Sequence, residues 1–165
     1  IPIIPLPPEA LENVMLYWED IPLFQAVVSP ASYTLTADNI KGFASEWDPF
    51  PPHVDEAAAA SSPVGRLFAA GVHLLSITIR LSHSILSEDT SSIASRGWEK
   101  LRFHRPGVVG DELRVRVVHV ERHRSHRPER GVLVTRFELF NQKGDTLVSF
   151  DSQVVMLRRT ALDAA

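Results

Sequence analysis

A carboxylate and an imidazole lie five residues apart in a proline-rich stretch of this 165-residue chain, at Asp48 and His53. These two side chains are well suited to share one water molecule and to move protons near neutral pH. Three of the four residues from 49 to 52 are prolines, which fix φ and favour an extended residue before each of them. We therefore expect a rigid loop to present both groups. A simpler interpretation needs no chemistry: Asp48 caps a turn and His53 opens the next helix.

Helical patterns flank this stretch on both sides. Thr36 is a suitable N-cap, and apolar residues then recur at helical spacing as far as Trp47. Residues 54–61 contain four alanines and predict a short helix. A longer helix is predicted over residues 71–87, beginning at Gly71, with apolar residues around most of its circumference. Such a distribution is typical of a helix buried on more than one side.

The long predicted helix also carries polar residues at 3-4-3-4 spacing: His73, Ser76, Arg80, His83 and Ser87. Residues at this spacing lie on one face of a helix. The pattern predicts a solvent-facing edge. The alternative is that one member of this polar stripe contacts a ligand, and Arg80 is the candidate for substrate binding.

The remaining half of the chain alternates apolar and charged residues with a period of two, which predicts β-strands. The alternation is visible near residues 101–103, 113–117, 133–139 and 147–157, with a phase slip at 117–118 that predicts a bulge. Residues 26–34 predict a first strand interrupted at Pro30, and residues 87–95 are polar and predict a loop. Together these patterns indicate an α+β protein whose antiparallel sheet wraps around a long central helix.

The order of these features resembles the MaoC-like dehydratases and R-specific enoyl-CoA hydratases of the hotdog superfamily. The matching residues are Asp48, Pro51, His53 and Gly71, followed by a turn at 109–113 and a hairpin at 124–131. The resemblance covers roughly residues 17–157. It implies a single hotdog domain over residues 1–165, with residues 1–10 as a proline-rich N-terminal arm.

The same resemblance implies an acyl-CoA hydratase or dehydratase. Hydration of a 2-enoyl thioester needs a water delivered to Cβ, a proton delivered to Cα and stabilisation of the enolate oxygen. Asp48 and His53 would hold the water, and the backbone N–H of Gly71 at the helix N-terminus would bind the thioester oxygen. The sequence does not assign the acid and the base within the pair.

Two residues depart from the pattern of this family. Phe50 stands where an Asn or Gln is usual, and Ala70 stands where a Ser or His is common. Both are candidates for substrate contact. They also support an alternative, a hotdog subunit that binds acyl-CoA or has a structural role with weak or no activity. A third possibility is an acyl-CoA thioesterase, in which a single carboxylate would act.

Composition narrows the choice of partners. The chain has 17 basic and 20 acidic residues, which argues against a nucleic-acid surface, and it has no cysteine. Asp48, His53 and Asp55 lack a second histidine at metal-ligand spacing, so we expect no metal and no cofactor. There is no apolar run of ~18 residues and no signal-peptide pattern, so we expect no membrane partner and a cytoplasmic location.

Two further expectations concern assembly and a charged segment. Hotdog sheets expose edge strands, so we expect a homodimer or a dimer of such dimers. The run Arg122-His123-Arg124-Ser125-His126-Arg127 is strongly basic. It has two interpretations: a solvated hairpin tip, or a contact for the phosphates of coenzyme A.

Overall fold

The computed structural model describes residues 15–86 and 89–159. The expected proline-rich arm at residues 1–10 therefore lies outside the described residues. Within the described ranges, no helix is long and apolar enough to cross a membrane. The elements are β1 (Ala26–Val28), β2 (Tyr33–Thr34), α1 (Ala37–Trp47), α2 (Pro51–Val54), α3 (Glu56–Ala60), α4 (Gly71–Ser82), β3 (Ser92–Phe103), β4 (Glu112–Arg124), β5 (Arg130–Phe140) and β6 (Thr146–Leu157).

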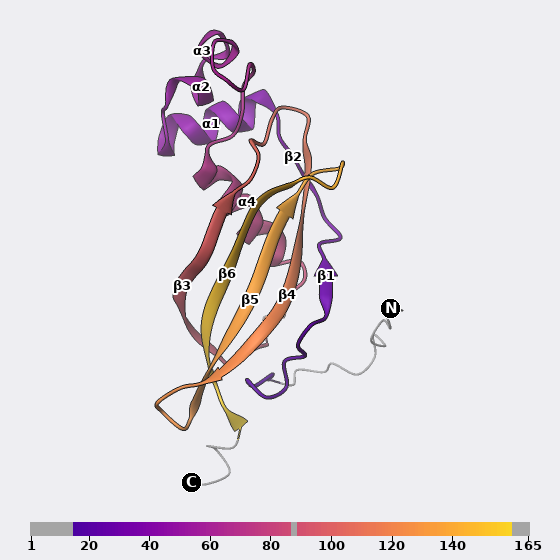
Figure 1. Cartoon of the computed structure of the whole chain (residues 1–165), viewed down its shortest axis with the longest axis vertical. Coiled ribbons are helices and arrows are strands. Elements are labelled where there is room, and N and C mark those ends of the chain that lie inside the picture. Colours follow the sequence, from indigo (N-terminus) through magenta and orange to yellow (C-terminus); the bar gives the residue numbers. More distant parts are fainter. Residues whose placement is uncertain (1–14, 87–88, 160–165) are drawn as a thin grey trace.

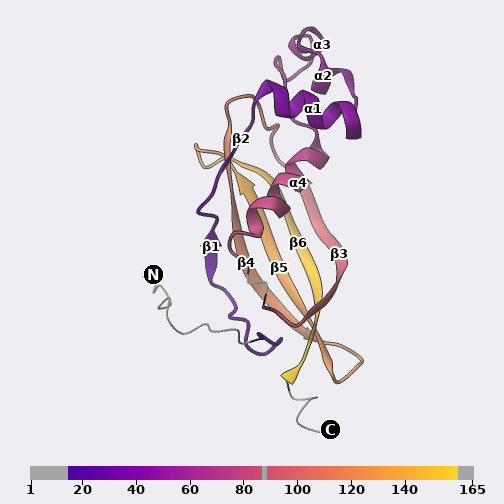
Figure 2. The ribbon, with the colours of Figure 1, turned by 180° about the vertical axis from the view of Figure 1, so that it is seen from behind.

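One antiparallel sheet curls around the central helix α4, as the sequence predicts for a hotdog fold. The strand order is β1-β4-β5-β6-β3, and β2 also pairs with β4. Figures 1 and 2 show α4 lying along the sheet, with α1, α2 and α3 gathered at one end and the β4–β5 hairpin at the other. The core lies between helix and sheet, where inward residues of α4 pack on alternate strand residues, including Leu74, Ile77, Leu81, Leu113, Val115, Phe137 and Phe150.

Helix α1 forms as predicted, because its first turn is closed by a reciprocal cap. The Thr36 hydroxyl accepts a hydrogen bond from the Asn39 amide at 3.2 Å, and the Asn39 side chain accepts one from the Thr36 amide at 2.9 Å. This capping box satisfies backbone donors that have no partner within the helix. Ile40 and Ala44 are buried on its inner face. The helix ends at Trp47, which places Asp48 at its C-cap.

Two element boundaries and the position of one bulge differ from the sequence prediction. Helix α4 ends at Ser82 instead of residue 87; the Ser82 hydroxyl donates to the Ile79 carbonyl at 2.8 Å and the chain turns. Strand β3 begins at Ser92, inside the expected loop, because β6 supplies its ladder partners and its exposed side tolerates polar residues. The bulge in β4 lies between His119 and Glu121, two residues beyond the predicted phase slip.

The polar stripe predicted on α4 is wrong at its first member. His73 is buried, and its ring stacks on Phe43 of α1 with centroids 4.3 Å apart, while Tyr33 meets it edge-on at 6.1 Å. Helix α1 covers this turn of α4. The spacing of polar residues in α4 does not predict that contact. Burial lowers the pKa of His73, which favours the neutral form of the ring. Ser76, Arg80 and His83 are exposed as expected.

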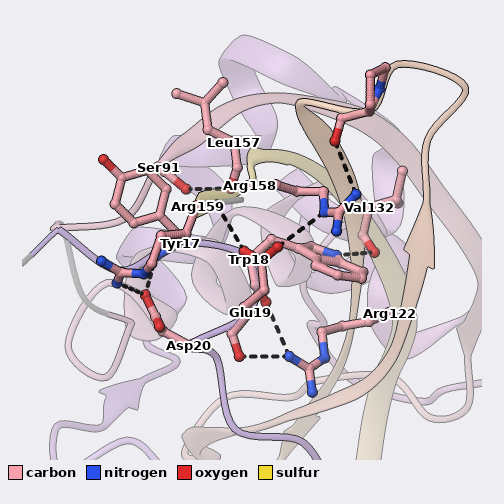
Figure 3. A network of polar contacts seen from close by, with 11 residues as sticks. Tyr17, Trp18, Glu19, Asp20, Ser91, Arg122, Val132, Leu157, Arg158 and Arg159 are labelled. Atoms are coloured by element: carbon pink, nitrogen blue, oxygen red, sulfur yellow. Dashed lines mark hydrogen bonds and ion pairs between the residues drawn. The ribbon is translucent and has the colours of Figure 1, made fainter. Parts of the chain in front are cut away.

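Residues 17–20 and 157–159 contact each other at the base of the β4–β5 hairpin (Figure 3). The Trp18 indole N–H donates to the Val132 carbonyl at 3.0 Å, and the Trp18 amide donates to the Leu157 carbonyl at 3.1 Å. Gly131 is required beneath this indole, because a Cβ there would lie 2.5 Å from its ring atoms. The Arg158 guanidinium pairs with Glu19 at 3.0 Å.

Candidate active site

Asp48 and His53 are positioned by two consecutive helices. The Asp48 amide caps α1 by donating to the Ala44 carbonyl at 2.9 Å, which leaves its side chain free of any capping duty. His53 lies in α2, so the stretch is partly a helical turn and the prediction of a loop without regular structure is wrong there. Pro51 occupies the first position of α2, where its fixed φ suits a helix and its missing N–H costs nothing. The prolines still restrict φ in this stretch, but in a helical turn.

The two side chains face each other at a distance suited to sharing a ligand. His53 Nε2 and Asp48 Oδ2 are 4.0 Å apart, which is too long for a direct hydrogen bond. A water molecule beside this line can reach both atoms. The two side chains differ in environment: that of His53 is 9% exposed and that of Asp48 is 42% exposed. Solvent therefore reaches the pair from the side of the carboxylate.

The orientation of the imidazole is fixed by a backbone carbonyl. His53 Nδ1 lies 2.9 Å from the Phe68 oxygen. A carbonyl oxygen only accepts, so we assign the hydrogen of the neutral ring to Nδ1, which makes Nε2 the acceptor that faces Asp48. Two phenyl rings hold the imidazole edge-on, Phe50 at 5.6 Å and Phe68 at 4.6 Å between centroids. The geometry favours His53 Nε2 as the proton acceptor of the pair.

Gly71 opens α4 a short distance along the chain from this carbonyl. The first amides of an α-helix have no intrahelical acceptor, so the Gly71 N–H and the helix dipole can act on an external oxygen. The ring of Phe103 from β3 covers its α-carbon, and a Cβ at Gly71 would lie 2.9 Å from Phe103 Cε1. Ala70, the N-cap, is fully buried and offers no side-chain donor.

The segment joining the imidazole to Gly71 is held against the body of the protein. Phe68 forms an isolated antiparallel bridge with Val108, and the Ala69 amide donates to the Gly107 carbonyl at 2.8 Å. Because His53 bonds to Phe68 and Gly71 follows three residues later, one pinned segment sets the position of both. This segment links the predicted acid–base pair and the predicted oxyanion donor along the chain.

The remaining candidates fall at different places. Phe50 is 56% exposed beside the His53 ring, so it belongs to the mouth of the site. Arg80 lies nine residues beyond Gly71, about 14 Å along the helix axis. It lines an open apolar groove of about 600 Å³ along the outer face of α4, with Val72, Leu75, Ser76, Ile79, His83 and Trp98. The structure thus groups Asp48, Phe50 and His53 and separates Arg80 from them.

Two neighbours of the site were missed from the sequence. Phe68 acts through its main-chain oxygen, for which side-chain chemistry gives no signal. Phe103 was placed in a strand by the alternation of apolar residues, yet its contact with Gly71 depends on how β3 crosses the start of α4. The structure therefore adds one orienting group and one covering ring.

Comparison with known proteins agrees with the fold. The family model described as "MaoC like domain" matches residues 22–139. The MaoC-like dehydratase from Rhodospirillum rubrum is 34% identical and has a TM-score of 0.77, with 87% of this chain and 98% of that chain covered.

Two further relatives extend the comparison. The (R)-hydratase from A. caviae involved in PHA biosynthesis is 27% identical, with a TM-score of 0.64 over 85% of this chain and 99% of that chain. The uncharacterized protein YdeM of Bacillus subtilis is 30% identical over 119 residues, 71% of this chain and 82% of its own length. With a family match that covers most of its length, the chain belongs to the MaoC-like family of hotdog proteins.

Proposed function

We propose that this protein is a hydro-lyase that adds water to a 2-enoyl-CoA thioester, or removes it from the 3-hydroxyacyl-CoA. The observation that carries the proposal is the acceptor nitrogen of His53 facing Asp48 at 4.0 Å, with its tautomer set by the Phe68 carbonyl. An acid–base pair that can hold one water between its members is what hydration requires. The similarity to a MaoC-like dehydratase and an (R)-hydratase supports the same reaction class.

In the proposed mechanism the two side chains have distinct roles. Asp48 accepts a hydrogen bond from the water and orients its oxygen toward Cβ, while His53 Nε2 removes the other hydrogen as a proton when the C–O bond forms. The hydroxyl group that forms on Cβ keeps the hydrogen bonded to Asp48. Electron density moves to the thioester oxygen, where the Gly71 N–H and the start of α4 stabilise the enolate. The His53 imidazolium, stabilised by Asp48, then returns its proton to Cα. Dehydration is the same sequence in reverse.

Two other functions use the same fold and are distinguished by one assay. Phe50 and Ala70 favour a subunit that binds acyl-CoA without turnover, and a lone carboxylate would suit a thioesterase. With crotonyl-CoA, we expect the absorbance of the conjugated thioester to fall with no release of free thiol. Thiol release would identify a thioesterase. Binding without either signal would show that the site is not catalytic.

We also propose that two copies pair through their β3 strands. Nearly the whole of β3 is exposed, and it carries the apolar residues Ile93, Trp98 and Phe103 at 45%, 44% and 53% exposure. In the described part of the chain β3 pairs on one side only, with β6. An unpaired strand of this length offers a template for an identical strand related by a two-fold axis.

Sedimentation tests this pairing. We expect a species of twice the 18.4 kDa chain mass, or four times if dimers associate, at micromolar concentration. Ile93→Lys places a charge on the pairing strand and should shift the protein toward monomer. Val27→Lys is a matched control, because Val27 is 48% exposed on β1 at the other edge of the sheet. A wild-type protein that sediments only as monomer would refute the pairing.

A further inference from the structure

The strongest positive feature outside the site is the tip of the β4–β5 hairpin. Arg124, His126 and Arg127, here called the basic tip, are all exposed. Among the described residues neither arginine has an acidic partner, whereas the nearby Glu129 is 3.6 Å from Arg130. The chain as a whole has a net charge of −3, so this concentration of unpaired cations contrasts with the rest of the surface. Arginines presented in this way can bind phosphate oxygens bidentately.

The basic tip is held in place by the network at the base of the hairpin (Figure 3). Arg158 donates from its side chain to the Pro128 carbonyl at 3.0 Å and from its amide to the Glu129 carbonyl at 2.9 Å. Its guanidinium also pairs with Glu19 and lies over the Trp18 ring at 5.3 Å. A turn fixed by Arg158, which is itself held by Glu19 and Trp18, loses little freedom on binding a ligand, which favours affinity.

The sheet register shows how far the basic tip lies from the site. One row of paired residues crosses the sheet through Ser92, Met156, Gly131 and Arg124. At the other end of β3, Phe103 covers Gly71. Within one protomer the tip and the site are therefore separated by nearly the full length of β3, about 36 Å for the eleven residue steps from Ser92 to Phe103. In Figure 1 they lie at opposite ends of the molecule.

Pairing of two β3 strands about a two-fold axis removes this separation. An antiparallel match over the full strand sets Ser92 of one protomer opposite Phe103 of its partner. The partner's row, which begins at its Ser92, then lies beside Phe103 of the first protomer. Counted from this Phe103 across the partner's β3, β6, β5 and β4, the partner's Arg124 is four strand spacings away, about 19 Å. Figures 1 and 2 both show the hairpin tip bending toward the β3 side of the sheet, which shortens the gap.

We propose that the basic tip of one protomer binds the nucleotide phosphates of the coenzyme A thioester whose acyl group occupies the partner's site. The inference rests on the proposed function and on the β3 pairing. Coenzyme A carries its phosphates at the end of a long pantetheine arm, so its charged end lies far from the reacting thioester. The tip across the two-fold is at a distance of that kind from Gly71, whereas the tip of the same protomer is not.

The first test compares two substrates with the same acyl group. Arg124→Ser/Arg127→Ser should raise KM for crotonyl-CoA about tenfold and leave kcat unchanged. Both constants should be unchanged for crotonyl-pantetheine, which has no phosphates. Lys143→Ser, at the β5–β6 turn at the other end of the sheet, is the matched control and should behave as wild type. An unchanged KM for crotonyl-CoA, or an equal rise for both substrates, would overturn the proposal.

Calorimetric titration with free coenzyme A separates this inference from the proposed function. If wild type fails to hydrate either substrate, the hydratase proposal fails, and the phosphate contact is still tested by this titration. We expect the double variant to bind coenzyme A about tenfold more weakly than wild type and than Lys143→Ser. Equal affinities would overturn the proposal.

Co-expression tests whether the tip acts across the two-fold axis. In the mixed dimer, one protomer carries Asp48→Asn and the other carries Arg124→Ser/Arg127→Ser. If the tip acts on the partner's site, the intact Asp48/His53 pair of the second protomer receives the intact basic tip of the first. Low-KM turnover of crotonyl-CoA should therefore appear in the mixed dimer, although neither parent shows it. If the tip served its own protomer, no mixed site would be intact and this component would be missing.

Discussion

Asp48→Asn is expected to slow the hydration of crotonyl-CoA by ~10²–10⁴, the usual contribution of a positioned acid or base. The asparagine amide keeps the size of the side chain but carries no negative charge. It therefore accepts a weaker hydrogen bond from the water and does not stabilise the His53 imidazolium. Folding should be unaffected, because Asp48 caps α1 through its backbone and its side chain is 42% exposed. Thermal unfolding measured beside the activity assay checks this.

His53→Ala should lose a similar factor, and the double variant should be little slower than either single one. A water held by one partner alone is already misplaced, so the two losses overlap instead of adding in free energy. Asp38→Asn is a suitable control, since Asp38 is an exposed carboxylate in the first turn of α1. A properly folded variant of either residue with wild-type turnover would favour the acyl-binding alternative.

Local patterns explain why so much of the fold could be predicted from the sequence. The capping box at Thr36 and Asn39 and the alternation in β4, β5 and β6 depend on neighbours in the chain. These elements appear where the sequence places them. The start of α4 at Gly71 belongs to the same group. The prediction places the first residues of β3 in a loop, because they are polar. They form a strand because β6 pairs with them and their side chains are exposed.

The site was predictable in its residue types but not in its assembly. Asp48 and His53 were identified by chemistry and spacing, yet their separation of 4.0 Å depends on α2 forming where a rigid loop was expected. The tautomer of His53 depends on the Phe68 carbonyl, fifteen residues away, and main-chain oxygens leave no mark on a sequence. Likewise, the burial of His73 follows from α1 packing across α4, which helical periodicity in α4 alone cannot report.

The effect expected for Gly71→Ala follows from the space around this residue. Alanine keeps the N–H, but under the proposed mechanism its methyl group crowds a thioester that approaches this amide, and an oxyanion donor that cannot be reached typically costs 10²–10³ in rate. We expect kcat/KM for crotonyl-CoA to fall about 10²-fold. The fold should survive, because the atom that a new Cβ meets at 2.9 Å is the far edge of the Phe103 side chain and not backbone.

Gly42→Ala is the matched control for this substitution. Gly42 also lies in a helix, α1, but a Cβ there meets nothing within 4 Å. It should keep wild-type activity and gain roughly 0.5–1 kcal/mol in the free energy of unfolding, as expected when alanine replaces glycine in a helix. Equal activity in the two variants would remove Gly71 from the site.

Combining Gly71→Ala with Phe103→Ala separates crowding from blocked access. If the loss arose only because the new methyl group displaces the Phe103 ring, removal of that ring would restore turnover. We expect turnover to stay low in the double variant, because the methyl group itself occupies the approach to the Gly71 N–H. Restoration to the level of Phe103→Ala alone would instead show that the ring, and not the amide, is the part of this contact that the reaction needs.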